Sequence, residues 1–443
     1  MKHFSLSRGL GVFVVAAFTV CATSDSSGNP LATIDQHALD ALAIEISNDD
    51  HFVVLKAEAK AAFQTAHGLP ISDEAASSLD EAIDELAFSS IQKAVNTDAY
   101  HPKIYWVDAG PRNWFGLDVP GGRYSYDNPD CFFRTIPIDY SLDYVVRGYR
   151  HTPGPADVTF SLISDPNSQN TVAALAGTDL VIESDGSYTV TINSSSANGQ
   201  ANHIQSTLLA KQLLIRNNLG DWFAKPDNLT VEVINADAHS AKSKADIILA
   251  AGWDLQESIV DYGVGALGLK TMTNQVNTLA DPSQSSSLGT LTTQASSFGH
   301  FDLSDTEALV ATLTKGPADY FVVPLSNPWM ITKDPGTRQI SLNSAQAEPN
   351  ANGTYTFVIS PSDPGVYNWI DMAGLHEVTT MVRWQGLPTS NSSASDALSV
   401  VAQIVPLADL KTVLPDGTRF VTVEERKAQL AKRVEAYALR TAV

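Results

Sequence analysis

The residues best suited to chemistry gather in residues 363–384, which read DPGVYNWIDMAGLHEVTTMVRW. In an enzyme, His376 would be the general base, Asp371 the acid or a cation ligand, and Arg383 the group that stabilises negative charge. Glu377 follows His376 directly and would add a further ligand for a divalent cation. The structural alternative is a loop closed by ion pairs, because ionic networks also gather titratable groups.

Three more residues of this segment have side chains suited to holding a ligand, namely Asn368, Trp369 and Trp384. The two tryptophans would form aromatic walls for a sugar ring or an apolar substrate, and the amide would fix a polar group. The alternative is that both tryptophans pack inside a core.

A second polar and aromatic cluster occupies residues 124–139, YSYDNPDCFFRTIPID. Its functional interpretation is a polar rim that binds a ligand or a cation, with Asp130 as an alternative acid and Arg134 as an alternative stabiliser of negative charge. Its structural interpretation is a tight turn over residues 127–130, because Asn before Pro is extended and Asx side chains bond to nearby backbone. Arg134 would then pair with one of the carboxylates. The candidate ligand contacts in this cluster are Tyr126, Asp127, Asn128, Asp130 and Arg134.

A third group comprises Arg216, Asp221 and Trp222. These residues are candidate ligand contacts, although a buried ion pair at a strand turn is the more typical arrangement. Cys131 fits a buried apolar position, because Arg134 is the only nearby charge that would lower its pKa.

No common cofactor motif is supported. Gly263, Gly265 and Gly268 match the spacing of a dinucleotide fingerprint, but a helical pattern precedes them and no βαβ unit surrounds them. The sequence contains no GxxxxGK loop, GxSxG elbow or HExxH helix. We therefore expect no nucleotide cofactor, while a divalent cation stays possible.

The charge balance argues against nucleic acid as a partner. The chain has 49 acidic and 28 basic residues and a formal net charge of −21, whereas phosphate binding needs clustered Lys and Arg. The same charge repels anionic membranes. Its simplest interpretation is a well-solvated surface.

The first 22 residues are typical of a secretory signal peptide. Lys2, His3 and Arg8 precede an apolar run that ends in small residues, and cleavage after Ala22 would give a periplasmic or secreted protein. Lipidation at Cys21 is less favoured, because Val20 is not the small residue that normally precedes a lipidated cysteine. Cleavage leaves one cysteine and hence no intramolecular disulfide. No later apolar run reaches the ~20 residues of a membrane span, so no integral membrane segment is expected.

The predicted helices lie at the two ends of the chain and in its middle. After a polar tether over residues 23–33, apolar residues recur at helical spacing within 34–97, which predicts two helices. Residues 237–300 predict a helix followed by a Ser-, Thr- and Gln-rich connector. Residues 411–443 end on a helix that begins with a capping box, Thr422 and Glu425, and that would dock through Leu430, Val434 and Tyr437.

Strand patterns fill the two intervals between these helices. Residues 98–236 contain short Tyr-, Val-, Ile- and Thr-rich segments at 144–146, 180–183, 188–192 and 229–234, with a turn at 184–186 (SDG). Residues 301–410 contain similar segments at 320–324, 354–359 and 379–384. The expected fold is mainly β with flanking helices (α+β), with two antiparallel β-sandwich domains.

Several motifs together make the chain resemble a bacterial family known as domain of unknown function 1214, often paired with domain of unknown function 1254. They are YDNPDCFFRTIPID, SDGSYTV, LLIRNNLGDW, LSDTEALV, YFVVPLSNPW, DPGVYNWIDMAGLHEVTTMVRWQG and, less distinctively, the last forty or so residues. Leu375, an extra residue before His376, and Cys131 depart from the family pattern. The resemblance implies two jelly-roll-like domains linked and flanked by helices, and it implies no activity.

Three functions fit these observations. The first is an exported protein that binds a small molecule or glycan in a cleft lined by Trp222, Trp369, Trp384 and Tyr126. The second is a hydrolase or lyase that acts on a carbohydrate-like substrate. The third is a structural component of the cell envelope. The sequence leaves the oligomeric state open.

Overall fold

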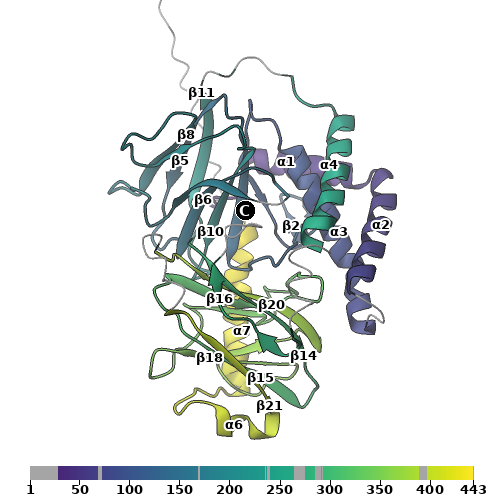
Figure 1. Ribbon diagram of the computed structural model, residues 1–443, viewed down its shortest axis with the longest axis vertical. Helices are drawn as coiled ribbons and strands as arrows, with labels where there is room; N and C mark the ends of the chain where they lie inside the picture. Colours follow the sequence, from purple (N-terminus) through teal and green to yellow (C-terminus); the bar gives the residue numbers. More distant parts are fainter. Residues whose placement is uncertain are drawn as a thin grey trace, which may run out of the picture.

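The computed structural model describes residues 28–67, 72–167, 170–234, 236, 240–263, 275–284, 291, 293–388 and 397–442. The predicted signal peptide, most of the tether and most of the glycine motif at 263–268 lie outside them. The fold is mainly β with flanking helices, as expected (Figure 1). None of the helices among the described residues is long and apolar enough to cross a bilayer.

Four helices pack together beside the first set of sheets (Figure 1). They are α1 (Ile34–Ser47), α2 (His51–His67), α3 (Asp73–Val95) and α4 (Lys244–Ser258). The first predicted helix is in fact two helices. Asn48 ends α1, and Asp49 Oδ1 accepts the amide of His51, 2.9 Å away, at the start of α2.

The first β-sandwich has sheets of five and four strands. The five-stranded sheet has the order β1 (Tyr105–Val107), β4 (Cys131–Pro137), β10 (Gln212–Asn218), β6 (Asp157–Ile163), β7 (Thr171–Ala176). The other has the order β11 (Asn228–Ile234), β5 (Asp143–Tyr149), β8 (Ser187–Asn193), β9 (His203–Gln205). Alternating buried residues such as Tyr188, Val190 and Ile192 form the core between them.

The second β-sandwich repeats this plan. One sheet has the order β12 (Thr278–Leu279), β14 (Ala295–Asp302), β20 (Glu377–Gln385), β16 (Tyr320–Pro324), β17 (Ser341–Asn343), with β13 (Ser283–Gln284) also paired to β14. The other has the order β19 (Trp369–Asp371), β18 (Tyr355–Ser360), β15 (Glu307–Leu313), β21 (Val400–Pro406). All pairs in both sandwiches are antiparallel except β8–β9 and β18–β19.

Two local expectations were wrong. The predicted connector contains β12, β13 and the start of β14, because its small Ser and Ala side chains fit under the packed sheet, where Ala295 to Phe301 are buried. Residues 180–183 form no strand, although the turn at 184–186 does form: Gly186 N donates to Glu183 O at 2.9 Å.

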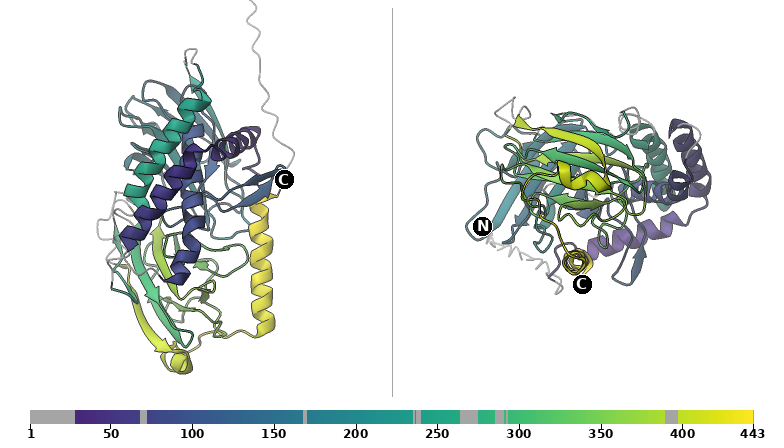
Figure 2. Two further views of the ribbon diagram at one scale, coloured as in Figure 1. Left: turned by 90° about the vertical axis from the view of Figure 1, so that its right-hand side faces the viewer. Right: turned by 90° about the horizontal axis from the view of Figure 1, so that it is seen from below.

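The C-terminal helix α7 (Val423–Ala438) joins the two sandwiches (Figure 2). Its capping box is present as predicted. Of its predicted docking residues, Tyr437 packs against Trp222 and Leu430 is partly buried, whereas Val434 is 45% exposed, and Arg426, Arg433 and Arg440 are buried instead. These arginines stack on aromatic rings and donate to backbone carbonyls, so their polar ends stay satisfied inside the protein.

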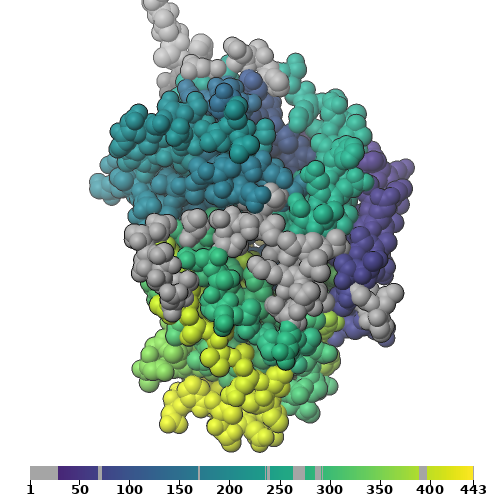
Figure 3. All heavy atoms as spheres, viewed as in Figure 1, coloured from purple at the N-terminus to yellow at the C-terminus, as the bar shows by residue number. Residues whose placement is uncertain are grey.

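A buried carboxylate, Asp130, joins the two sandwiches, which form the upper and lower halves of the molecule in Figure 3. It accepts hydrogen bonds from Tyr320 Oη at 2.5 Å, Trp222 Nε1 at 2.7 Å and Asn343 Nδ2 at 2.9 Å. Trp222 belongs to the first half, whereas Tyr320 and Asn343 lie in β16 and β17 of the second. Burial raises the pKa of Asp130, and the three donors oppose that rise.

We expect Asp130→Ala to lower the free energy of unfolding by about 3 kcal/mol, because buried donors on both sandwiches lose their acceptor. Urea unfolding of the mature protein measures this change. Asp416→Ala, at an exposed turn, is the matched control and should stay within about 0.5 kcal/mol of wild type. Equal effects of the two substitutions would contradict the role given to Asp130.

Candidate functional site

The predicted catalytic residues have separate partners. His376 lies at the surface, where its Nε2 is 3.1 Å from Asp305 Oδ1 and its Nδ1 is 3.5 Å from Glu74 Oε2. Asp371 pairs with Arg338 at 2.9 Å and caps the amide of Ala373. The structure therefore favours the ion-pair interpretation of this loop.

The third predicted catalytic residue, Arg383, is buried in β20. It donates to the backbone oxygens of Tyr126 and Met381. No hydrogen bond or ion pair among the described residues joins it to His376 or Asp371, so these three side chains do not form one site.

The four aromatic residues that were predicted to line one cleft lie in separate parts of the protein interior. Trp384 is wholly buried in the core of the second sandwich and donates to Thr314 O, while Trp369 is buried and donates to Ser360 O. Trp222 packs in the core around the helices, and Tyr126 packs in a small separate cluster. Asn368 is also structural, since its amide bonds to Glu348 and Thr356 backbone.

The predicted Asx turn is present in the second cluster. Asp130 N donates to Asn128 Oδ1 at 3.1 Å, and Cys131 N donates to Asn128 O at 2.9 Å. The predicted pairing of Arg134 with a carboxylate of this turn is wrong. Arg134 instead donates to Asp227 O at 2.6 Å, because β4 directs it toward the neighbouring strand end.

The predicted ion pair between Arg216 and Asp221 is also absent among the described residues. Arg216 Nη1 donates to Ser161 Oγ at 3.2 Å across the sheet. Asp221 is exposed and accepts the amide of Phe223 at 3.0 Å. Arg216 is buried within β10 (Gln212–Asn218), whereas Asp221 lies exposed beyond the end of this strand, which explains the difference.

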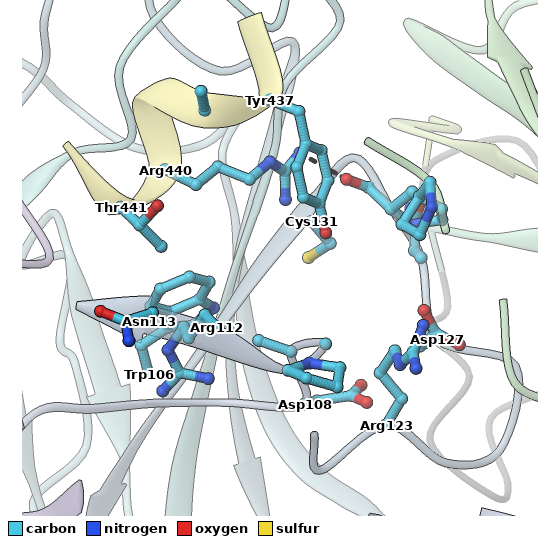
Figure 4. A pocket seen from close by; sticks show the side chains of 17 residues that line it. Trp106, Asp108, Arg112, Asn113, Arg123, Asp127, Cys131, Tyr437, Arg440 and Thr441 are labelled. Carbon is cyan, nitrogen blue, oxygen red and sulfur yellow. Dashed lines mark hydrogen bonds between the residues drawn. The ribbon is translucent and has the colours of Figure 1, made fainter. Parts of the chain in front are cut away.

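A cavity of about 150 Å³ lies where the first sandwich meets the end of α7 (Figure 4). Asp127, Asn128 and Cys131 line it, so part of the second predicted cluster does reach a pocket. Most of its other lining residues come from the chain around the short hairpin of β2 (Arg112–Trp114) and β3 (Leu117–Val119), and from the end of α7 with the turn η4 (Leu439–Thr441). Trp106 of β1 and Pro335 of the second half of the chain also line it.

Arg112 is the most informative residue of this cavity. Its side chain is 5% exposed, and its Nη2 lies 3.3 Å from both oxygens of Asp40. Within the described residues its Nε and Nη1 are buried without an acceptor, and so is Nε1 of Trp106, which also lines the cavity. Buried donors without acceptors are rare because each costs about 1–3 kcal/mol.

The surroundings hold Arg112 rigidly. Its guanidinium lies 4.5 Å from the ring centre of Trp106 and 5.2 Å from that of Trp114. Asp40 also accepts hydrogen bonds from Tyr105 and Trp114, so this carboxylate has a fixed position. The unused nitrogens Nε and Nη1 therefore have fixed positions on different edges of the guanidinium, and each can donate to an acceptor in the cavity.

Two acidic residues, Asp108 and Asp127, also line the cavity. Burial, and next the negative charge of Asp127, raise the pKa of Asp108 well above its usual range. Burial also raises the pKa of Asp127, although Arg123 opposes this and Thr332 N donates to its carboxylate at 2.8 Å.

The backbone at this place is unusual. Asp108, Ser125 and Tyr126 have φ values of +56°, +55° and +64°, in a region that residues other than glycine rarely adopt. Strain of this kind clusters at functional sites. Cys131 also lines the cavity. Burial raises the pKa of its thiol, which is therefore a poor nucleophile.

The C-terminal turn closes the cavity from above. Arg440 and Tyr437 line it, and the guanidinium of Arg440 lies 4.7 Å from the ring centre of Phe132 (Figure 4). Asn29 Nδ2 donates to Arg440 O at 3.0 Å and to Ala442 O at 2.9 Å. The start of the described chain therefore holds the turn that covers the site.

This arrangement fits binding of an acceptor-rich group better than metal chemistry. Among the described residues, no group of three His, Cys, Asp or Glu side chains is placed to hold a metal ion. Nothing in the sequence pattern marked Arg112, Trp106 or Arg440 as site residues. Their contact depends on a hairpin, a strand and the last helix coming together.

Comparison with known proteins gives the fold alone. Neither a family model nor a curated protein matches the chain. A solved structure of a putative uncharacterized protein from Burkholderia cenocepacia is similar, with a TM-score of 0.65 and 20% identity over 83% of this chain and 99% of that one. The VPA0106 protein from Vibrio parahaemolyticus matches with a TM-score of 0.36 and 10% identity over 63% of this chain and 90% of that one. Neither is described by an activity or a ligand.

The pH dependence of stability tests the structural role of His376. Its hydrogen bond to Asp305, followed by the charge of Glu74, raises its pKa. The group therefore stabilises the fold fully below its unfolded pKa of about 6.5, and this contribution is lost as pH rises through the folded pKa.

We expect His376→Gln to lower the melting temperature below about pH 6.5 and to have little effect at alkaline pH. Thermal unfolding across this pH range gives the answer. The difference should shrink when Asp305→Asn is also present. A melting-temperature loss that is the same at every pH would argue against this ion pair.

Proposed function

We propose that this is an exported protein that binds a small monocarboxylate in the Arg112 cavity. The observation that carries the proposal is the set of three buried donors without acceptors, Arg112 Nε, Arg112 Nη1 and Trp106 Nε1, all on residues that line one cavity. A carboxylate bound in the cavity would supply acceptor oxygens to donors of this set. The apolar run that begins the chain is the basis for export.

The size and walls of the cavity narrow the ligand class. A volume of about 150 Å³ is similar to that of an engineered protein cavity that holds benzene. Pro111, Pro129, Pro335 and Tyr437 supply apolar walls around the polar end. We infer a ligand with one carboxylate and a compact apolar body, for which benzoate is a suitable probe.

The carbohydrate hydrolase or lyase alternative has less support, because its three catalytic candidates contact different partners. We also propose that the chain is related to domain of unknown function 1214, as the sequence resemblance suggests. This resemblance does not indicate a ligand.

The test is titration calorimetry of the mature protein with benzoate. Arg112→Lys keeps a positive charge beside Asp40 but removes the planar fork, so we expect the Kd to rise about tenfold or more. Arg147→Lys is the matched control, because Arg147 forms an exposed ion pair with Glu232 at 2.7 Å, and its Kd should match wild type.

Benzylamine, which has the same ring and the opposite charge, should not bind. The proposal is wrong if benzylamine binds as well as benzoate, or if Arg112→Lys leaves benzoate affinity unchanged.

A further inference from the structure

We propose that a second cavity, formed between the two sandwiches and α7, is a binding site for a neutral saccharide. Its volume is about 400 Å³, within the range of ~300–1,000 Å³ that is common for ligand sites. It shares no lining residue with the Arg112 cavity. The two sites can therefore be tested separately.

Three parts of the chain form this cavity. The loop that contains Trp222 and Phe223 comes from the first sandwich, the segments around Gln346 and Tyr367 come from the second, and Lys432 belongs to α7. Sites between domains are frequent places for ligands, because parts of the chain that are far apart in sequence converge there. Asp130, which binds Trp222, holds the first of these parts against the second.

The aromatic lining suits a sugar ring. Phe223 and Tyr367 are half-buried, so part of each ring remains accessible in the cavity. Lys432 Nζ lies 5.7 Å from the ring centre of Phe223, and the guanidinium of Arg419 lies 4.4 Å from that of Tyr367. These contacts fix rings on which the C–H face of a pyranose can pack.

The polar lining consists mainly of amides. Gln346 Oε1 accepts Asn343 N at 3.3 Å, Gln429 Oε1 accepts from Arg426 Nη1, and Gln339 Nε2 donates to the backbone of Trp369. Contacts among the described residues therefore use one end of each amide. The other ends supply two donor groups and one acceptor, which suits hydroxyls because a hydroxyl both donates and accepts.

The charges favour a neutral ligand. The guanidinium of Arg433 already donates to Pro335 O at 2.7 Å and to Ser341 O at 3.1 Å, and it stacks 4.2 Å from the ring centre of Trp222. Of the other charged lining residues, Lys432 and Asp221 are both exposed and have opposite signs. The opposite charges of Lys432 and Asp221 would give an anionic sugar little net electrostatic attraction. A neutral sugar does not depend on such attraction.

The experiment uses calorimetry and melting curves of the mature protein with three neutral trisaccharides, maltotriose, cellotriose and triacetylchitotriose, and with glucuronate. We expect at least one neutral trisaccharide to bind at millimolar concentration or below, and glucuronate to bind more weakly. Ala345→Trp should fill the cavity and weaken binding at least tenfold, because Ala345 is exposed and lines it.

Phe223→Ala, which removes one aromatic ring from the cavity, should also weaken binding at least tenfold. This variant tests the proposal if Ala345→Trp fails to fold. Gln403→Ala and Phe420→Ala, at exposed positions outside the cavity, are the matched controls and should bind as wild type does. The proposal is overturned if none of the three trisaccharides binds, if glucuronate binds best, or if binding survives both cavity substitutions.

Discussion

The architecture depends on one buried carboxylate. Asp130 is wholly inaccessible to solvent and accepts hydrogen bonds from both sandwiches. A buried carboxylate without donors would be very costly, so the two halves are held in the one arrangement that satisfies it. Both cavities lie close to this junction, since Trp222 lines one and Asn128 and Cys131 line the other.

The last helix makes use of the same junction. Arg426 and Arg433 are seven residues apart, which is about two helical turns, so they lie on one face of α7, and Arg440 follows at the same spacing in the turn η4. Arg433 and Arg440 stack 4.2 and 5.1 Å from the ring centre of Trp222. Planar cations thus dock this helix where apolar side chains were expected, and the same face contributes to both cavities.

Local features were predictable from the sequence, and long-range polar contacts were not. The alternating strand at Tyr188 to Ile192, the capping box at Thr422 and the Asx turn at Asn128 depend on neighbouring residues, and all three are present. The loop of His376 has the residue types of an active site, yet each side chain finds a different partner. Arg112 became visible as a site residue only in three dimensions, because Asp40, whose carboxylate fixes it, is 72 residues away in sequence.

The central claim is that the unused donors of Arg112 and Trp106 receive a carboxylate. A crystal structure of the mature protein grown with benzoate tests it most directly. The account predicts a carboxylate oxygen of benzoate within about 3 Å of Arg112 Nε or Nη1, with its ring against the proline walls. Benzoate bound only elsewhere, with water alone beside Arg112, would contradict it.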